Sequence, residues 1–466
     1  MPVAVWILIS GLDDLFITMV GFATSRVRFP WPSSGDLKSA AEQPIAIFVP
    51  LWHEHRVIGR MLEHNLAAVR YGNYHVFAGV YPNDTPTLRA VELQAAVHPK
   101  IHTAICPHDG PTSKGDCLNW IYQHMRAWEA RHGTRFRVVV LHDAEDLIDP
   151  ESLRLINWFS RDYEMVQVPV LPLATAVKEW THGLYCDEFA EYQRKDIPVR
   201  QQLGGFLPSN GVGTGFGRDA LERLADGRNG RPFDPACLTE DYETGYLLHE
   251  LGCRQIFLPV RFRENGPTAT REFFPRGARA AISQRTRWVT GIALQSWERH
   301  GWRVPLSQLY WFWRDRKGLI GNLLSPAANL LFLYGAGSYA FSTGHPSAWH
   351  LGSHIPPWLA GSCRLTLAIA ALQTGVRARS AALIYGWKFA AGVPLRMVWG
   401  NLVNFAATAM ALWEFGNSRR RGGGLAWRKT DHMYPTALAT SGVRYQPLLK
   451  NPIPDVASRA AAGEFY

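Results

Sequence analysis

Hydrophobic positions divide the first part of the chain into short, regularly spaced apolar runs. The runs cover residues 45–50, 74–81, 138–141 and 165–170, and they are rich in β-branched and aromatic side chains. Helix-length stretches of mixed polarity separate most of them. Because strands that alternate with helices usually pair in parallel, this pattern predicts an α/β domain with a mostly parallel, Rossmann-like sheet.

A longer apolar segment precedes this region. Residues 1–23 are long enough to span a bilayer and lack a charged first region, so they predict an anchor more than a cleaved signal. Asp13 and Asp14 interrupt the segment, and acids inside a membrane usually face protein groups or a polar cavity. The alternative is a segment that lies partly at the interface. Two arginines, at positions 26 and 28, place the following residues in the cytoplasm.

A second apolar region follows the α/β part of the chain. Residues 318–341 and 356–376 have the length and composition of transmembrane helices. Residues 381–415 are apolar but contain Pro394 and Arg396, which leaves a hairpin and interfacial helices both open. The predicted organisation is a transmembrane helix at 1–25, a cytoplasmic α/β domain at 40–300, interfacial and transmembrane helices at 301–415, and a cytoplasmic tail at 416–466.

Charge and cysteine content narrow the class of protein. The 466 residues carry a net charge of +10, which suits anionic lipid, an anionic substrate or nucleic acid. No basic helix or aromatic–basic RNA signature is present, so we expect no nucleic-acid partner. The six cysteines form no CxxC pattern and are expected to be reduced thiols, not a zinc site or a disulfide framework.

The run at residues 138–141 ends in a cluster of acids. Asp143 and Glu145 are two residues apart, so in an extended segment their side chains would share one face. Such hard oxygen ligands suit Mg²⁺ or Mn²⁺ on a phosphorylated substrate, with Asp146 as an alternative ligand. Ligands also bind at the carboxyl ends of parallel strands. The alternative is the acidic first turn of a helix.

Two further segments carry unusual compositions. Residues 204–217 are dense in glycine but contain neither the GK[ST] sequence of a Walker loop nor GxGxxG spacing. The family resemblance described below implies a loop beside the acceptor and donor sugar, and a close approach of its backbone explains the glycines. Residues 261–283 hold five arginines. This second segment fits a mobile gating element, a membrane-surface patch or an ordinary solvated loop.

Two motifs later in the chain, together with the acids at residues 143–146, form an ordered set. A TED sequence occupies residues 239–241, and a QRTRW sequence occupies residues 284–288, just before the second apolar region. In this order the three motifs resemble those of the processive family-2 glycosyltransferases, the group that includes cellulose and hyaluronan synthases. The residues around them look most like the phage-adsorption inner-membrane (NfrB-like) glycosyltransferases. The resemblance covers nearly the whole chain and implies a GT-A fold.

The resemblance assigns roles to individual side chains. The catalytic group is Thr239, Glu240 and Asp241, with Asp241 as the general base that an acceptor hydroxyl of high pKa requires. The donor-nucleotide pocket matches Pro50, Glu54, Asp84, Lys114, Asn119 and Asp143. The acceptor or product site matches Gln284, Arg285, Arg287 and Trp288. Two alternatives remain: Asp84 as a turn residue and Trp288 as a membrane-interface anchor.

The resemblance implies an inverting, metal-dependent enzyme of the bacterial inner membrane, with Mg²⁺ or Mn²⁺ as cofactor. It would move a sugar, by resemblance an amino sugar, from a UDP-sugar onto a growing surface polysaccharide. Coupling to export and an outer-membrane export or receptor partner are also implied. Two alternatives remain open: a single-addition transferase that acts on a lipid-linked acceptor, and a non-catalytic envelope or phage-receptor scaffold.

Overall fold

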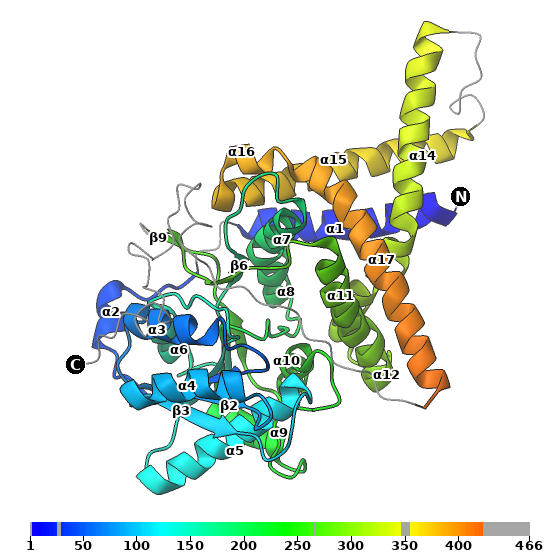
Figure 1. Cartoon of the computed structure of the whole chain (residues 1–466). Helices are drawn as coiled ribbons and strands as arrows, with labels where there is room; N and C mark the ends of the chain where they lie inside the picture. The colour runs from blue at the N-terminus through cyan, green and yellow to red at the C-terminus, as the bar shows by residue number, and fades with distance from the viewer. Residues whose placement is uncertain (1, 26–28, 264–265, 346–354, 423–466) are drawn as a thin grey trace, which may run out of the picture.

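The computed structural model describes residues 2–25, 29–263, 266–345 and 355–422. A seven-stranded sheet with the order β3-β2-β1-β4-β7-β5-β8 forms its centre (Figure 1). Only β7 runs antiparallel to its neighbours, so the predicted mostly parallel sheet is confirmed. The strands are β1 (Ile45–Pro50), β2 (Tyr74–Val80), β3 (Ile101–Ile105), β4 (Val138–Leu141), β5 (Met165–Gln167), β7 (Thr214–Gly217) and β8 (Gln255–Phe257).

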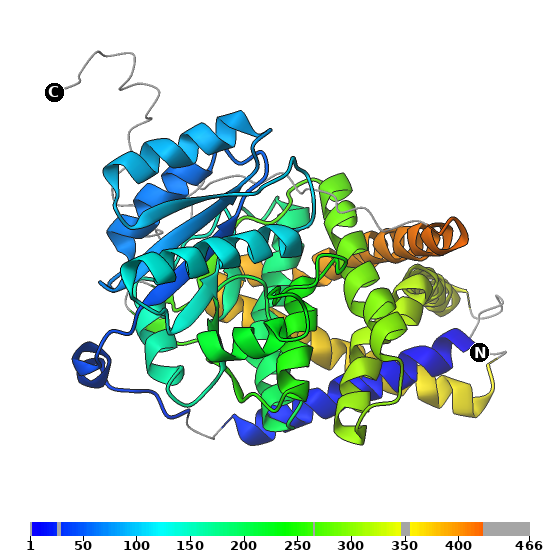
Figure 2. The same ribbon diagram turned by 90° about the horizontal axis from the view of Figure 1, so that it is seen from below.

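Both faces of the sheet are covered by helices, which explains why β1 is apolar at nearly every position. Alternate residues of a strand point to opposite faces. Ile45, Ile47 and Val49 pack against α3 (Ile58–Ala68), α4 (Thr85–Val97) and α6 (Ser152–Phe159). Ala46 and Phe48 belong to the core on the other face, with α5 (Lys114–His132), α9 (Arg218–Ala225) and α10 (Glu240–Glu250). Figure 2 shows the two layers edge-on.

The acids that follow β4 do not lie on an extended segment. Residues 142–147 form a turn. The Asp146 carboxylate closes this turn, because it accepts hydrogen bonds from the backbone N–H of Asp143 at 3.1 Å and the His142 ring at 2.7 Å. Asp146 is therefore directed into the protein, whereas the partly exposed Asp143 and the buried Glu145 line a cavity at the carboxyl ends of the strands.

Several predicted segments contain more structure than the sequence pattern indicated. The run at 165–170 is interrupted at Pro169 and continues as β6 (Val170–Pro172), which pairs with β11 (Thr270–Glu272). The arginine-rich stretch also contains β9 (Phe262–Arg263) and β10 (Gly266–Pro267), and it leads into α11 (Ala278–Trp288). The segment before β1 includes α2 (Ser34–Ser39), which Ser33 and Asp36 cap reciprocally.

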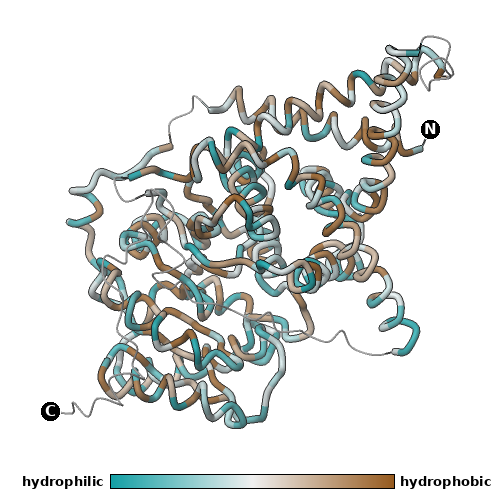
Figure 3. The backbone as a smooth tube through the Cα atoms, turned by 45° about the horizontal axis from the view of Figure 1, so that its top comes forward, coloured by the Kyte–Doolittle hydropathy of each residue, from teal (hydrophilic) through white to brown (hydrophobic). Residues whose placement is uncertain are grey.

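A helical layer lies beside the sheet domain. It contains α7 (Trp180–Glu191), the π-helix η1 (Tyr192–Asp196), α8 (Ile197–Gln202), the π-helix η2 (Val289–Gln295), α12 (Ser296–His300) and α13 (Leu306–Arg316). Three stretches in the described residues are long and apolar enough to cross a membrane. They are α1 (Pro2–Thr24), Leu306–Gly344, which joins α13 to α14 (Gly318–Gly344), and α15 (Pro357–Tyr385). Figure 3 shows the apolar residues concentrated along these helices.

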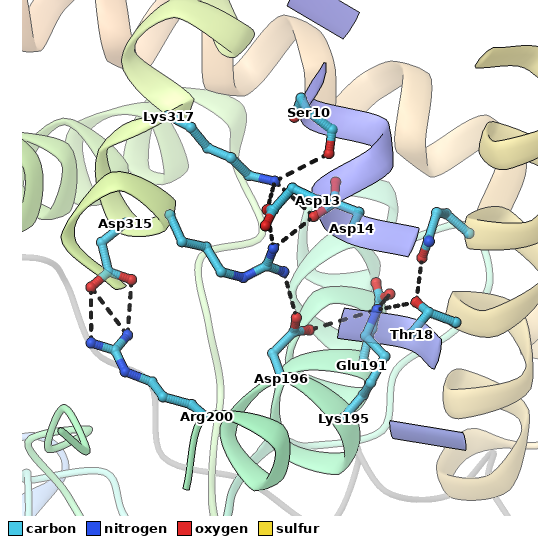
Figure 4. A network of polar contacts seen from close by, with 12 residues as sticks. Ser10, Asp13, Asp14, Thr18, Glu191, Lys195, Asp196, Arg200, Asp315 and Lys317 are labelled. Carbon is cyan, nitrogen blue, oxygen red and sulfur yellow. Dashed lines mark hydrogen bonds and ion pairs between the residues drawn. The ribbon is translucent and has the colours of Figure 1, made fainter. Parts of the chain in front are cut away.

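The acids in the first apolar segment have partners. Asp13 forms ion pairs with Arg314 and with Lys317, whose Nζ lies 2.7 Å from an Asp13 oxygen and 2.7 Å from an Asp14 oxygen (Figure 4). Ile17 of the same helix packs in a core with residues of α8 and α13. The second half of α1 is therefore attached to the helical layer.

The stretch at 381–415 is not a hairpin. After α15 and the short α16 (Trp387–Ala390), α17 (Val393–Arg420) is one continuous helix that packs against α7, α11 and α14. Pro394 is tolerated because it lies in the first turn, where its missing N–H removes no helical hydrogen bond. Residues 346–354, between the two predicted transmembrane helices, and residues 423–466, most of the predicted tail, lie outside the described residues.

Candidate active site

One cavity of about 520 Å³ connects the carboxyl ends of the strands with the helical layer. We call its two parts the sheet-side region and the helix-side region. The sheet-side region is lined by Pro50, Leu51, Trp52, Glu54, Tyr81, Lys114, Asp143 and Glu145. The helix-side region is lined by Glu188, Phe189, Glu191, Tyr192, Asp196, Asp315 and Arg377. Glu240, Asp241, Gln284, Arg287 and Trp288 line the same cavity and complete its wall.

Lys114 connects the acids at the strand ends. It is the first residue of α5, after Ser113, whose side chain accepts the N–H of Asp116 and caps the helix. Its Nζ lies 2.7 Å from Asp143 Oδ1 and 4.0 Å from Glu240 Oε1. Burial lowers the pKa of Lys114, but the charges of Asp143 and Glu240 outweigh it and hold the pKa above its ordinary value. The site therefore holds a positive charge at a helix N-terminus, where phosphate binds readily.

The two predicted metal ligands that line the cavity are Asp143 and Glu145. Within the described residues no group of three or more His, Cys, Asp or Glu side chains is placed to hold a metal ion by itself. Mg²⁺ and Mn²⁺ sites for phosphorylated substrates typically use one or two carboxylates together with substrate oxygens. Two carboxylates beside a phosphate-binding helix start fit that kind of site. Asp146 is fully buried and is hydrogen-bonded to the ring of His142. It is not among the residues that line the cavity.

The TED residues begin α10, with Thr239 as its N-cap residue. Burial, followed by the charge of Asp241, raises the pKa of Glu240 to about 7. Burial also raises the pKa of Asp241, against the lowering effect of Lys114. Two adjacent buried carboxyls with raised pKa values are suited to exchanging a proton near neutral pH.

The glycine-dense segment is shaped around Asp241. Gly211 has φ +75° and lies so close that a Cβ there would be 2.7 Å from Asp241 Oδ2. Pro208, Ser209, Asn210 and Val212 line the cavity beside it, and the chain then enters β7. Glycine is thus required at position 211 both by the left-handed backbone and by the close approach to the acid.

The QRTRW residues have two different environments. Gln284, Arg287 and Trp288 line the cavity, and the Trp288 ring packs near Phe274 and Phe189, with centroids 6.4 Å away in each case. Arg285 does not line it. Its guanidinium bonds Glu188 at 2.6 Å and Asn404 of α17 at 2.7 Å, and it lies over the Tyr185 ring. Arg285 therefore fastens α11 to α7 and α17.

The residues predicted to bind the donor nucleotide fall into two groups, those that line the cavity and those that do not. Pro50, Glu54, Lys114 and Asp143 line the cavity. Asp84 accepts the backbone N–H of His53 at 2.6 Å and caps α4. Asn119 exchanges hydrogen bonds with the backbone of Phe233, at 2.8 and 3.0 Å. Neither Asp84 nor Asn119 is among the residues that line the cavity, and both hold neighbouring loops in place.

Some cavity residues received no role from the sequence. Trp52 and Tyr81 face each other edge-on, with ring centroids 5.4 Å apart, and give the sheet-side region an aromatic wall. Glu272 is brought beside the acidic turn because its neighbour Arg271 pairs with Leu147. The signals for these residues were weak: Trp52 directly follows the first strand, but nothing in the sequence relates residue 272 to residues 143–147.

The sheet domain and most of the elements that line the cavity match a known protein family. Residues 42–291 match the family described as Glycosyltransferase like family 2. The chain belongs to glycosyltransferase family 2. The match covers more than half of the sequence and includes β1 through α11. The predicted family and enzyme class are confirmed.

Two curated relatives extend the similarity past the family domain. The chain is 38% identical over 465 aligned residues to the bacteriophage adsorption protein B of Escherichia coli K12, and equally to the bacteriophage N4 adsorption protein B of Escherichia coli O157:H7. The alignment covers 93% of this chain and 61% of each relative. The chain thus spans about three fifths of the length of these relatives.

A solved structure shares the fold. It is a mannosyltransferase from Pyrobaculum calidifontis in complex with GDP-Man and Mn²⁺, which is 18% identical and superposes with a TM-score of 0.52. The superposition covers 87% of this chain and 98% of that one. The GT-A fold that the family resemblance implied is therefore confirmed for this glycosyltransferase.

Proposed function

We propose that this glycosyltransferase is an inverting, divalent-metal-dependent enzyme of the bacterial inner membrane that extends a surface polysaccharide from a UDP-sugar. One observation supports the proposal most strongly: the helix-start cation Lys114, the acid Asp241 and the aromatic Trp288 line one cavity. That cavity extends from the strand ends to residues of α13 and α15, within two of the stretches that have the length and composition of membrane spans.

The sheet-side region is assigned to the nucleotide diphosphate. Lys114 and the exposed N–H groups at the start of α5 would neutralise the diphosphate, and the Trp52 and Tyr81 rings offer faces for the base. Asp143 and Glu145 would hold the metal ion, which, when bound, supplies Lewis-acid assistance to the leaving diphosphate. We expect the diphosphate to draw Lys114 partly away from Asp143.

Transfer then proceeds as one displacement at the anomeric carbon. The acceptor oxygen forms a bond to C1 as the bond between C1 and the diphosphate oxygen breaks, and UDP leaves with that electron pair. The acceptor hydroxyl proton passes to Asp241. A single displacement inverts the anomeric configuration, by the logic that applies to inverting glycosidases. Glu240 lies next to Asp241 in the sequence, and the charge of Asp241 contributes to the raised pKa of Glu240.

The alternatives make different products. A single-addition transferase would place one sugar on a lipid-linked acceptor, whereas an extending enzyme yields chains of increasing length. A scaffold would tolerate loss of Asp241. We infer an amino sugar as donor, an export pathway and an outer-membrane partner from the family resemblance. The 38% identity to phage adsorption proteins supports a role at the cell envelope.

The test is UDP release by the purified full chain in detergent. A panel of UDP-sugars is incubated with Mn²⁺, Mg²⁺ or EDTA, and product length is followed by gel electrophoresis. We expect metal-dependent release from one sugar and a loss of about 10²–10⁴-fold in Asp241→Asn. Asp219→Asn, an exposed acid of α9 outside the cavity, is the matched control. Undiminished transfer by Asp241→Asn would refute the assignment of the base.

A further inference from the structure

Three helices from distant parts of the chain meet at one junction in the helical layer. The Thr18 hydroxyl of α1 donates a hydrogen bond to Gln373 of α15 at 3.0 Å and accepts one from Lys195 of η1 at 3.4 Å (Figure 4). The Arg377 guanidinium of α15 lies 2.6 Å from the carboxylate of Glu191, which directly precedes η1. Side-chain contacts therefore hold α1, η1 and α15 next to one another.

Two arginines at this junction, Arg194 of η1 and Arg379 of α15, lie close together without a carboxylate partner. Arg194 is three positions after Glu191, and Arg379 is two positions after Arg377, so the ion pair between Glu191 and Arg377 places the two arginines on neighbouring turns. Among the described residues, neither guanidinium has an ion-pair or hydrogen-bond partner. Burial, followed by the positive charge of Arg379, lowers the pKa of Arg194. Two like charges thus face each other where one of them is partly buried.

The cations next to this pair are all neutralised by acids. The ion pairs are Lys195 with Glu191, Arg377 with Glu191, Arg314 with Asp13 and Asp196, and Lys317 with Asp13 and Asp14. The acids of the junction are therefore already engaged, and Arg194 and Arg379 add positive charge that they do not offset. Like charges held close together in a partly buried place repel each other, and a bound anion would remove that repulsion.

The surroundings of the two arginines have the character of a membrane surface. Both α1 and α15 are long and apolar enough to cross a membrane, and Arg379 follows the apolar stretch at residues 356–376. On α1, Met19 is 62% exposed and Phe22 is 54% exposed, and Gly21 between them packs against η1. Exposed hydrocarbon and unpaired positive charge therefore lie side by side. Basic pockets between membrane helices on the cytoplasmic side are places where phospholipid head groups bind.

The backbone at this place is also unusual. Arg194 lies in the middle of η1, which is a π-helix, and π-helical turns are rare and frequently occur at functional sites. Tyr192 and Asp196 of the same π-helix line the cavity, whereas Arg194 and Arg379 are not among the lining residues. The arginine pair is therefore separate from the cavity but adjoins one of its walls.

We propose that Arg194 and Arg379 bind the phosphate group of an anionic phospholipid at the membrane surface, between α1, η1 and α15. Guanidinium groups match phosphate with paired, charge-assisted hydrogen bonds. The acyl chains would lie along the exposed apolar side of α1. A zwitterionic lipid also carries a phosphate, but its head-group cation would be repelled by the arginines, so we expect a preference for anionic lipid. The inference goes beyond the proposed function and does not depend on which sugar is transferred.

The first test measures lipid binding by the purified, delipidated full chain in uncharged detergent. Native mass spectrometry follows the bound lipid as phosphatidylglycerol or phosphatidylcholine with the same acyl chains is added. We expect the wild type to bind one phosphatidylglycerol about tenfold more tightly than phosphatidylcholine, and Arg194→Gln and Arg379→Gln each to weaken phosphatidylglycerol binding about fivefold. Arg89→Gln, which changes an exposed arginine on α4 of the sheet domain, is the matched control and should bind as the wild type does.

The second test is thermal unfolding, in which the two conditions should give opposite orders of stability. In uncharged detergent without lipid, Arg379→Gln removes a repulsion, so its Tm should equal or exceed that of the wild type. With phosphatidylglycerol present, the wild type should have the higher Tm, because only its intact arginine pair gains from the phosphate. A variant that misfolds would be less stable in both conditions and cannot produce this reversal.

Three outcomes would overturn the inference. The first is equal affinity of the wild type for phosphatidylglycerol and phosphatidylcholine, and the second is unchanged phosphatidylglycerol binding in both variants. The third is displacement of phosphatidylglycerol by millimolar inorganic phosphate, which would assign the pair to a soluble phosphate compound in place of a lipid. UDP release is not measured in either experiment, so the proposed function stands or fails separately.

Discussion

Lys114 and Asp143 form an ion pair in the sheet-side region of the cavity, with Nζ 2.7 Å from Oδ1. The lysine begins α5, which follows β3, and the aspartate follows β4, so the pair joins two βα units that are consecutive in the chain but separated by β2 and β1 in the sheet. Both side chains are less than one third exposed. The pair holds positive and negative charge at the place where a diphosphate and its metal ion are expected to bind.

Removing this lysine should impair donor use. Lys114→Met eliminates the positive charge at the helix start and leaves Asp143 and Glu240 to repel the diphosphate. We expect kcat/KM for the UDP-sugar to fall by about 10²-fold or more, as when a charge-stabilising donor is removed from an active site. Steady-state UDP release measures this loss. Arg135→Met, which breaks an exposed ion pair outside the cavity, should leave kcat/KM within twofold.

The pH dependence should report the TED carboxyls. Burial and the charge of Asp241 raise the pKa of Glu240 to about 7, so Glu240 is largely protonated at pH 6 and largely ionised at pH 8. Burial also raises the pKa of Asp241. A general base acts only when deprotonated, so kcat/KM should rise with pH through an apparent pKa near 7 that belongs to the pair.

Glu240→Gln provides the comparison for the pH profile. It removes the carboxyl group whose pKa is about 7 and leaves Asp241 to titrate by itself, so the rising limb should move to lower pH. Rates from pH 5 to pH 9 in one buffer of constant ionic strength would show the shift. A profile that is flat from pH 5.5 to pH 8 in the wild type would contradict the assignment.

Gly211 should be intolerant of a methyl group. Gly211→Ala combines the strain of φ +75° with a Cβ 2.7 Å from Asp241 Oδ2, and displacing the base by about 1 Å can cost about 10²-fold in rate. Gly227→Ala has a similar φ of +73° but no atom within 4 Å of its Cβ. It should show only the backbone strain, about 1–2 kcal/mol, in thermal unfolding. Equal activities of the two variants would argue against a steric clash between the new methyl group at position 211 and the Asp241 carboxylate.

Substitution of the two arginines of the QRTRW sequence should affect different properties, stability in one case and turnover in the other. Arg285→Ala leaves Glu188 without its cation and releases Asn404, so the free energy of unfolding should drop by about 3 kcal/mol or more. Arg287→Ala removes a side chain that lines the cavity. It should retain the thermal stability of the wild type and lose turnover. Thermal unfolding and UDP release, measured side by side, distinguish the two; a stable Arg285→Ala would disprove its structural role.

Metal use should depend on Glu145. We expect EDTA to abolish UDP release and added Mn²⁺ to restore it. Glu145→Gln should raise the Mn²⁺ concentration that gives half-maximal activity by about tenfold or more, because one of two expected protein ligands loses its charge. Glu151→Gln, which removes an acid paired with Arg70 outside the cavity, should not change that concentration. Full activity in EDTA would contradict the proposed cofactor.

Local sequence was enough to predict the first strands and their acidic ends. The apolar runs of β1, β2 and β4 are buried on both faces, so their signal is continuous and strong. The order of the acidic, TED and QRTRW motifs was also sufficient to assign the family. Each apolar run and each motif is a few residues long and can be recognised without knowing how distant segments pack.

Tertiary structure decided which of the singled-out residues meet in the cavity. From the sequence alone, Asp143 and Asp146 were both candidate metal ligands. In the structure, a hydrogen bond to His142 holds the Asp146 side chain in the protein interior. Arg285 and Arg287 lie two positions apart on α11, and the packing of α7 and α17 places only Arg287 at the cavity. The helix-side acids come from elements more than a hundred residues apart. Their convergence depends on long-range packing, which no local pattern in the sequence encodes.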